Sequence, residues 1–240
     1  MRIIEGSGPI ELAIVGCLHG NENFGKTVFD YYENKLDDYP GLRLIFANEE
    51  AYQKDVRYID KDLNTVFPGD ASGNHEQCLA AQLLPLVCDV AMVLDIHTTS
   101  SDIEMVPIIG SLDNGVDKIV QATKRKDIAQ MMGGIVAPSL IGNVRGGVSL
   151  EFGEVYATTD EALKEVSEII EALLEPTAIK PLQRRIFKFD ATIPLSTVLD
   201  KPASNFALQP THRFYPFLFD EKSNEHDQGF AAYAYEERFI

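Results

Sequence analysis

Two short apolar runs in this chain each end in a histidine, and this pattern restricts the fold more than any other feature. ELAIVGCL at 11–18 leads directly into HGNE, which contains His19 and Glu22, and VAMVLDIHTT at 90–99 carries His97 near its end. Runs of this length and composition are typical of buried strands. Side chains that follow the carboxyl ends of strands in an open α/β sheet gather at one edge. We therefore expect His19, Glu22 and His97 to lie close together.

Two histidines and one glutamate form a donor set that suits a zinc ion, and three protein ligands leave one coordination position open. An open position is typical of catalytic zinc sites. The sequence thus predicts a hydrolase with one Zn²⁺ per chain, bound by His19, Glu22 and His97. The alternative is that His19 is a hydrogen-bonded residue at the sheet edge and Glu22 only places charge at a helix N-terminus. Asp95 shares a strand face with His97, and it is either a partner of a ligand imidazole or a structural buried acid.

Strand and helix signals alternate along the first three quarters of the chain, which predicts an α/β fold with a largely parallel sheet flanked by helices. After Pro181 aromatic residues cluster or alternate without a helix signal. We therefore divide the chain into a hydrolase domain, 1–181, and a small β-rich C-terminal region, 182–240. The individual expectations are strands at 11–17, 42–48, 90–96 and 149–154, helices at 23–37, 75–88 and 158–175, and strand and turn character at 134–142. The last helix should be capped by Thr159 or Asp160 and ended by Pro176, and Gly153 should mark a bulge or a close backbone approach.

The net charge of -16 disfavours nucleic acid and anionic membranes as partners, because both would be repelled. A small anionic substrate is not excluded, since it responds to the local field of a pocket. The chain has no apolar stretch of membrane-spanning length and no apolar signal segment at its start, and its three cysteines form no spaced cluster. We therefore expect a cytoplasmic protein acting on a small molecule, with assembly into a homo-oligomer left open.

Four segments of the chain resemble the aspartoacylase/succinylglutamate desuccinylase family, which is related to the zinc carboxypeptidases. They are GCLHGNENFG, RYIDKDLN, LDIHTT and SLEFG, in the order and approximate spacing of that family. The resemblance is clear over 11–155 and looser beyond. It implies a zinc-carboxypeptidase-like fold and zinc binding by the three residues named above. It also implies that Glu151 activates the water and that Arg57 polarises the substrate carbonyl; Glu154 is a rival to Glu151 from the opposite strand face.

The chain departs from the family pattern at one position that concerns the substrate. Family members usually continue DLN with an arginine that, together with the asparagine, binds a carboxylate of the acylated amino acid. Here Asn64 is followed by Thr65, which cannot form a charged bidentate contact. Arg145 is a candidate to supply the missing charge, or else an exposed turn residue. Near the C-terminus Tyr233 or Tyr235 is a candidate substrate contact, or else a packing aromatic.

The leading interpretation is a zinc-dependent amidohydrolase that removes an acyl group from an amino acid or a similar amine. A metal-activated water would attack the amide carbonyl, and a non-peptide carbon–nitrogen bond would break. Two alternatives are a metallocarboxypeptidase acting on short peptides and a non-catalytic metal-binding protein. Thr65 leaves room for the last alternative, whereas Glu151 argues against it, because a purely structural site needs no base. The acyl group, the amine and the metal used in the cell stay open. His75, His212 and His226 lie in polar contexts and are expected on the surface.

Overall fold

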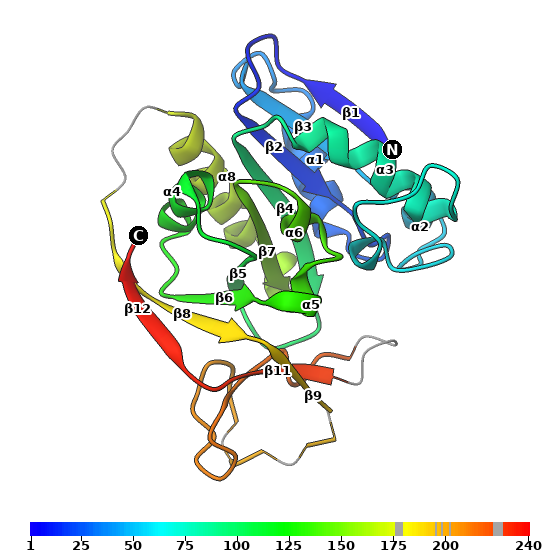
Figure 1. The fold of residues 1–240 in the computed structure, drawn as a ribbon. Coiled ribbons are helices and arrows are strands. Elements are labelled where there is room, and N and C mark those ends of the chain that lie inside the picture. Colours follow the sequence, from blue (N-terminus) through cyan, green and yellow to red (C-terminus); the bar gives the residue numbers. More distant parts are fainter. Residues whose placement is uncertain (176–179, 195, 198, 202, 223–227) are drawn as a thin grey trace.

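One nine-stranded sheet forms the centre of the protein (Figure 1). The computed structural model describes residues 1–240 except 176–179, 195, 198, 202 and 223–227. Within this described part the strand order is β1-β3-β2-β4-β7-β5-β6-β8-β12, and five of the eight neighbouring pairs are parallel. The strands are β1 (Arg2–Glu5), β2 (Leu12–Gly16), β3 (Leu42–Phe46), β4 (Met92–Thr99), β5 (Met105–Ile109), β6 (Asp127–Met131), β7 (Gly147–Gly153), β8 (Gln183–Phe189) and β12 (Tyr235–Phe239).

Helices cover both faces of this sheet. Every residue of β2 is buried, and its side chains point alternately to the two faces. In β2, Leu12 and Ile14 pack in one apolar cluster with α1 (Phe24–Tyr32), α4 (Asn114–Thr123) and α8 (Asp160–Leu174). Ala13 and Val15 point to the opposite face and pack with α3 (His75–Val87). The remaining short helices are α2 (Glu49–Gln53), η1 (Leu63–Thr65), α5 (Gly133–Val136), α6 (Leu140–Asn143) and α7 (Glu154–Ala157).

The C-terminal region adds a small antiparallel sheet at one end of the molecule, at the bottom of Figure 1. Its strands are β9 (Ala191–Pro194), β10 (Tyr215–Phe217) and β11 (Gln228–Ala232), in the order β10-β11-β9. Phe187, Phe189, Phe206 and Phe217 form its aromatic core. Two strands of the same region, β8 and β12, instead extend the main sheet through the pairing of β8 with β6. A domain boundary at 181/182 therefore stays a prediction.

The predicted elements correspond closely to the observed ones, with one error. The strands at β2, β3, β4 and β7 and the helices α1, α3 and α8 are confirmed, and the Thr159 side chain caps α8 by accepting from the Ala162 amide. Residues 134–142 were expected to have strand and turn character, but α5 and α6 form there. The hydroxyl of Ser139 caps α6 by accepting from the Gly142 amide, a local bond that the apolar composition does not reveal. Pro176, expected to end α8, lies outside the described residues.

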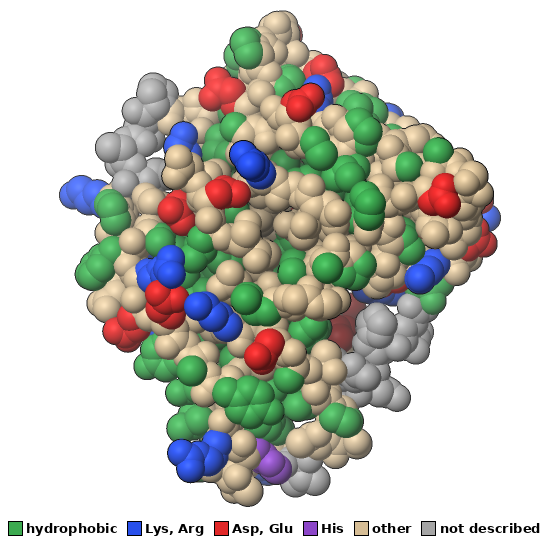
Figure 2. Space-filling view, viewed as in Figure 1, with side chains coloured by type: hydrophobic (Ala, Val, Ile, Leu, Met, Phe, Trp, Pro, Cys, Tyr) green, Lys and Arg blue, Asp and Glu red, His purple; other side chains and the backbone are tan. Residues whose placement is uncertain are grey.

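Acidic and basic side chains are interspersed on the face seen in the space-filling view, so the acidic excess is not gathered there (Figure 2). None of the helices in the described part of the chain combines the length and the apolar character needed to cross a membrane.

The end of β7 allows a test of the expected close backbone approach. A Cβ atom on Gly153 would lie 2.0 Å from the backbone oxygen of Ile103, whereas one on Gly134 in α5 would meet nothing within 4 Å. We expect Gly153→Ala to lower the free energy of unfolding by about 1–3 kcal/mol, because backbone atoms must shift. Gly134→Ala should change it by less than about 1 kcal/mol. Urea unfolding measures both, and equal losses in the two variants would contradict this account of β7.

Candidate active site

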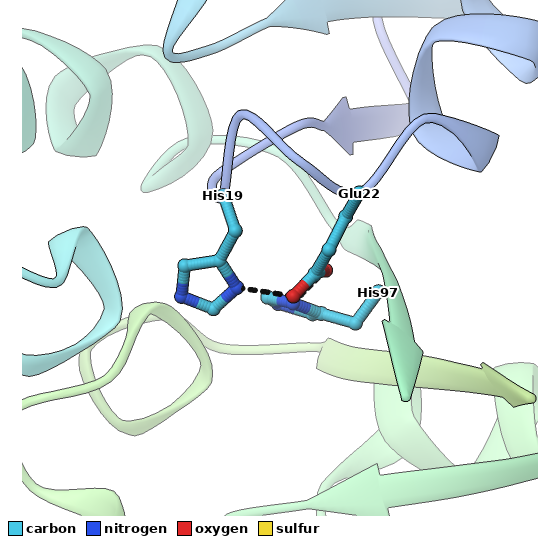
Figure 3. A group of neighbouring side chains, drawn as sticks. All are labelled: His19, Glu22 and His97. Carbon is cyan, nitrogen blue, oxygen red and sulfur yellow. Dashed lines mark hydrogen bonds and ion pairs between the residues drawn. The ribbon is translucent and has the colours of Figure 1, made fainter. Parts of the chain in front are cut away.

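The structure brings together the three residues predicted as metal ligands. His19 follows β2, Glu22 lies just before α1, and His97 belongs to β4 (Figure 3). All three are buried, and one donor atom from each lies within 4.8 Å of the others. The carboxylate of Glu22 lies between the two imidazoles: its Oε1 is 2.6 Å from His19 Nδ1, and its Oε2 is 3.0 Å from His97 Nδ1.

The local chain path after β2 explains why His19 and Glu22 face each other. Gly16 and Gly25 approach so closely that a Cβ atom on Gly16 would lie 2.7 Å from the Gly25 backbone oxygen. Cys17 adopts a left-handed backbone conformation with φ of 57°, which turns the chain away from the strand direction. The amide of Glu22 then donates to the His19 carbonyl at 3.2 Å and closes the turn.

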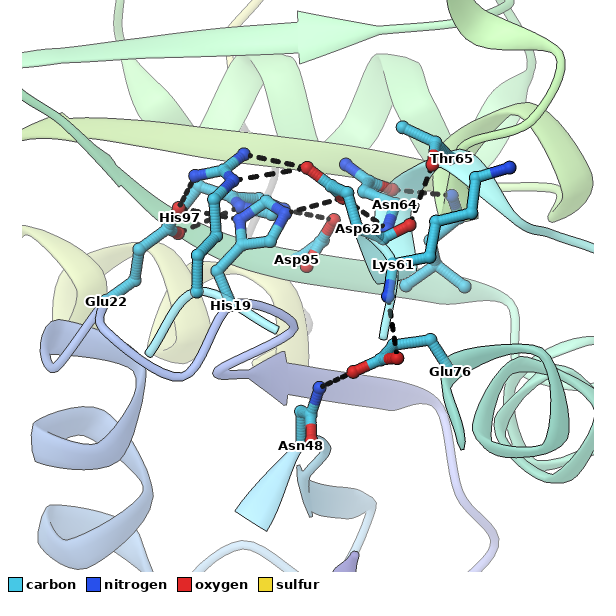
Figure 4. A network of polar contacts seen from close by, with 12 residues as sticks. His19, Glu22, Asn48, Lys61, Asp62, Asn64, Thr65, Glu76, Asp95 and His97 are labelled. Atoms are coloured by element: carbon cyan, nitrogen blue, oxygen red, sulfur yellow. Dashed lines mark hydrogen bonds and ion pairs between the residues drawn. The ribbon is translucent and has the colours of Figure 1, made fainter. Parts of the chain in front are cut away.

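Each imidazole is held at its other nitrogen by an aspartate (Figure 4). His19 Nε2 lies 2.9 Å from Asp62 Oδ1, and His97 Nε2 lies 2.8 Å from Asp95 Oδ2. A carboxylate at the far nitrogen is the usual way in which a metal-binding histidine is oriented, because it fixes the tautomer and strengthens the ligand. The donor set therefore fits a zinc ion, with Nδ1 of each ring as the atom directed toward Glu22.

Burial by itself lowers the pKa of both imidazoles, but the surrounding carboxylates outweigh it. Glu22 and Asp62 hold the pKa of His19 above its ordinary value, and Asp95 and Glu22 hold the pKa of His97 well above it. Burial would raise the pKa of Glu22, yet the two imidazoles lower it well below its usual range. A metal ion requires neutral imidazoles, so metal binding at these residues is coupled to proton release.

Glu151 lies next to His97 because the parallel register of β4 and β7 pairs these two residues. Side-chain alternation then places Asp95, His97, Ser149 and Glu151 on the same face of the sheet. Glu151 lines a cavity of about 440 Å³ together with His19, Glu22 and His97. Removal from solvent, supported by the charge of Glu22, raises the pKa of Glu151 to about 8, although His97 lowers it.

The rival carboxylate is placed differently. Glu154 is the first residue of α7 and is exposed, and the residues that line this cavity do not include it. The geometry thus favours Glu151 over Glu154 as the acid beside the candidate metal ligands.

Arg57 lies at the site and not on the open surface. Its guanidinium donates to Glu22 Oε1 at 3.1 Å and to Asp62 Oδ2 at 3.1 and 3.2 Å. Asp62 is itself buried and bonded to His19, so this is not a pairing of two surface side chains. Arg57 therefore connects two carboxylates that both contact candidate ligands.

Glu76 organises the loop that carries Arg57 and Asp62. This glutamate is fully buried at the start of α3, and its two oxygens accept from the backbone amides of residues 59, 60 and 61 at 2.7–3.1 Å. Oε1 also accepts from Asn48 Nδ2 at 3.1 Å (Figure 4). Four donors therefore share one carboxylate, which ties the loop to α3.

Asn64 and Thr65 both line the cavity, as expected for residues near a substrate. Their polar atoms are partly used within the protein. Asn64 Oδ1 accepts from the Leu140 amide at 2.9 Å, and Thr65 Oγ1 donates to the Asp62 carbonyl at 2.8 Å.

Arg145 is not among the described residues that line the cavity. It is exposed and precedes β7, whereas Glu151 lies toward the carboxyl end of that strand. Glu151 lies four residue steps along the strand from Gly147, a span of roughly 13 Å at about 3.3 Å per residue. Arg145 lies beside Gly146, whose amide donates to Asp113. Its role as a replacement for the missing arginine therefore stays a prediction.

The two candidate tyrosines also lie away from the cavity. Tyr233 is 62% exposed, and Tyr235 packs against Phe187 and Tyr215 at centroid distances of 5.0 and 5.6 Å. Neither tyrosine is among the described residues that line the cavity, so a role in substrate binding stays a prediction for both. The C-terminal residues that do line the cavity are Thr192, Leu218, Glu221 and Phe230.

Sequence reasoning missed Glu221, which connects the C-terminal region to the loop after β4. Its carboxylate accepts from the hydroxyls of Thr99 and Ser100, and the neighbouring Asp220 accepts from the Ser101 hydroxyl. No periodicity marks a contact between residues more than 100 positions apart. The role of Glu76 was missed because its carboxylate accepts from the backbone amides of residues 59–61, a type of contact that no sequence pattern marks. Asp62, in contrast, could have been found as a second acid within the RYIDKDLN segment. Of the other histidines, His212 is exposed, His75 is partly buried against Asn48, and His226 lies outside the described residues.

The arrangement around Glu76 predicts a measurable effect of removing its charge. Glu76→Gln keeps one acceptor oxygen and brings an NH₂ group toward backbone amides, so buried donors lose partners. We expect the free energy of unfolding to fall by about 1–3 kcal/mol and the amides of residues 59–61 to exchange faster with solvent. Glu50→Gln is the matched control, since Glu50 is a half-exposed residue paired with Lys54. Unchanged exchange at residues 59–61 in Glu76→Gln would contradict the role given to this carboxylate.

Comparisons with known proteins agree with the fold and the motifs. Residues 9–176 match the succinylglutamate desuccinylase/aspartoacylase catalytic domain. A probable aspartoacylase of Parasynechococcus marenigrum (strain WH8102) is 37% identical over 106 residues, covering 38% of this chain and 34% of that protein. Matches of this kind span about a third to two fifths of the length of the curated relatives.

Two solved structures of other proteins are similar to this protein over nearly its whole chain. Murine aminoacylase 3 is similar with a TM-score of 0.75 at 15% identity, covering 97% of each chain. The succinylglutamate desuccinylase of Chromobacterium violaceum is similar with a TM-score of 0.66 at 18% identity, covering 98% of this chain and 87% of that one. These likenesses confirm the predicted zinc-carboxypeptidase-like fold class. The match over 9–176 covers more than half of the chain, which therefore belongs to the succinylglutamate desuccinylase/aspartoacylase family.

Proposed function

We propose that this protein is a zinc-dependent amidohydrolase that cleaves the amide bond of an N-acyl amino acid or a related N-acylated amine. The observation that carries the proposal is the position of Glu151, which shares one cavity with the buried group His19, Glu22 and His97. A metal site that only stabilises the fold does not need a neighbouring carboxylate whose pKa is raised. Membership of a deacylase family supports the same reaction class.

Zinc held by His19, Glu22 and His97 would supply Lewis acidity, which polarises a carbonyl and lowers the pKa of water. Glu151 acts as the proton carrier: it accepts a proton from the attacking water and returns it to the nitrogen of the leaving amine. Its pKa of about 8 applies to the site without a cation, and a nearby positive charge favours the ionised, basic form. Arg57 faces the same cavity and can stabilise negative charge that develops on the carbonyl oxygen.

Replacing Glu151 by glutamine tests the proton-transfer role. The amide cannot accept the proton, so we expect kcat on a cleaved N-acyl substrate to fall by about 10²-fold or more, with zinc content unchanged. Glu154→Gln is the matched control, because Glu154 is an exposed glutamate three residues away. Steady-state kinetics with metal analysis measures both. Full turnover in Glu151→Gln would remove this residue from the mechanism, and no hydrolysis by the wild-type protein of any substrate in a broad N-acyl panel would favour a non-catalytic metal-binding protein.

Removing a candidate ligand tests the metal site. We expect His97→Ala to bind clearly less than one zinc per chain after purification in the presence of zinc, since two donors hold the ion much less tightly than three. Elemental analysis of the protein measures the metal content, and circular dichroism verifies that the variant is folded. His212→Ala provides the control, because its side chain is exposed and lies outside the ligand group. One zinc per chain in folded His97→Ala would refute the ligand set.

A further inference from the structure

We propose that the substrate of this site is an amide without an ionised carboxylate beside the scissile bond, namely an uncharged N-acylated amine with an apolar group that occupies the cavity. This inference rests on the proposed hydrolase function. It goes further by naming the substrate class: acidic amino acid derivatives are poor substrates, and neutral derivatives with an apolar substituent are the preferred ones.

The charges around the cavity do not favour an anion. Four carboxylates line it, those of Glu22, Asp62, Glu151 and Glu221. Among the described lining residues Arg57 is the one permanent cation, and it is already paired with Glu22 and Asp62. A divalent ion and Arg57 together bring three positive charges against four negative ones. The residues that the structure does not describe contain no lysine or arginine that could reverse this balance.

A neighbouring cavity is also lined by more acidic than basic side chains. A second cavity of about 530 Å³ shares Glu22, Arg57 and Glu221 with the first. It adds two acids, Asp55 and Glu154, and a single cation, Lys222. A substrate carboxylate would therefore meet an excess of negative charge on either side of Glu22.

The uncharged polar groups of the cavity offer no replacement for an arginine clamp. The Thr65 hydroxyl already donates its hydrogen to the Asp62 carbonyl, so it approaches a ligand as an acceptor. The Ser139 hydroxyl likewise donates to the Val136 carbonyl at 2.7 Å. Asn64 can still donate through its amide nitrogen, which suits a single hydrogen bond to a neutral carbonyl.

Several side chains that line the cavity are apolar and form what we call its apolar wall. Ile108 of β5, Met131 of β6, Ile141 of α6, Leu218 and Phe230 of β11 line it. These side chains come from both the main sheet and the C-terminal region, and together they form a surface that stabilises an apolar group by burial. A volume of about 440 Å³ lies within the range of pockets that enclose small-molecule ligands.

A pair of substrates that differ only in charge tests this inference. N-acetyl-L-phenylalaninamide and N-acetyl-L-phenylalanine have the same ring and amide, but only the second carries a carboxylate. With the zinc-loaded protein we expect kcat/KM for the neutral compound to be at least about tenfold higher, and N-acetyl-L-aspartate to be the poorest of the three. Calorimetric titration of zinc-loaded Glu151→Gln with the same compounds gives the order of affinity without turnover. Equal or tighter binding of the carboxylate would overturn the inference.

Thr65 provides a second, independent test because its side chain faces the cavity. Thr65→Arg adds a positive charge there, and we expect it to shift the ratio of kcat/KM values toward N-acetyl-L-phenylalanine by about tenfold. Thr65→Gln is the matched control: it also loses the bond to Asp62 and is similarly long, but it carries no charge, so it should keep the wild-type ratio. The same shift in both variants would show that charge does not select the substrate.

The two proposals fail in different ways. Hydrolysis of all compounds with preference for the carboxylates would refute the neutral substrate class and leave the hydrolase function intact. Absence of hydrolysis by zinc-loaded wild-type protein, combined with tighter binding of the neutral compound, would refute the hydrolase function while the selectivity of the cavity stands. Absence of both hydrolysis and selective binding would refute both.

Discussion

The carboxylate of Glu22 between two imidazoles is the interaction on which the rest of the site depends. Glu22 contacts His19 and His97 and also accepts from the Thr98 amide at 3.0 Å and from Arg57. A buried carboxylate is costly unless it is paired and hydrogen-bonded, and here four groups from three segments satisfy it. The turn after β2, the end of β4 and the loop of Arg57 are therefore held together by one acidic side chain.

A second set of acids holds the groups around Glu22 in place. Asp62 and Asp95 orient the two imidazoles, and Glu76 fixes the loop that carries Asp62. Asp62 and Glu76 are buried and each receive several hydrogen bonds, which is the condition under which buried polar groups give a unique geometry. Asp95 is also buried and accepts from His97 and Ser149 at Oδ2, while its Oδ1 has no hydrogen-bond partner within the described part of the chain. Precise positioning of ligands matters for a metal site because tautomer and ring orientation set the strength of each ligand.

The C-terminal region completes the cavity without supplying the predicted tyrosines. Glu221 attaches it to the loop after β4, and Leu218 and Phe230 contribute to the apolar wall. The substrate side of the site is therefore built largely from segments outside the recognisable motifs. The residues of the motifs carry the proposed chemistry, whereas residues outside the motifs form the cavity walls that would contact a substrate.

Much of the site was accessible from the sequence alone, because its key residues lie in or directly after apolar strands. The apolar runs predicted β2, β4 and β7, and parallel strands bring their carboxyl ends to one edge, so the meeting of His19, Glu22 and His97 followed from local pattern and general topology. The assignment of Glu151 to the same site came from the family resemblance. Tertiary structure alone decided which acids hold the imidazoles, where Arg145 lies and which residues line the cavity. The physical reason is that these features depend on strand register and on contacts between distant segments, such as Ser100 with Glu221, which leave no periodic trace in the chain.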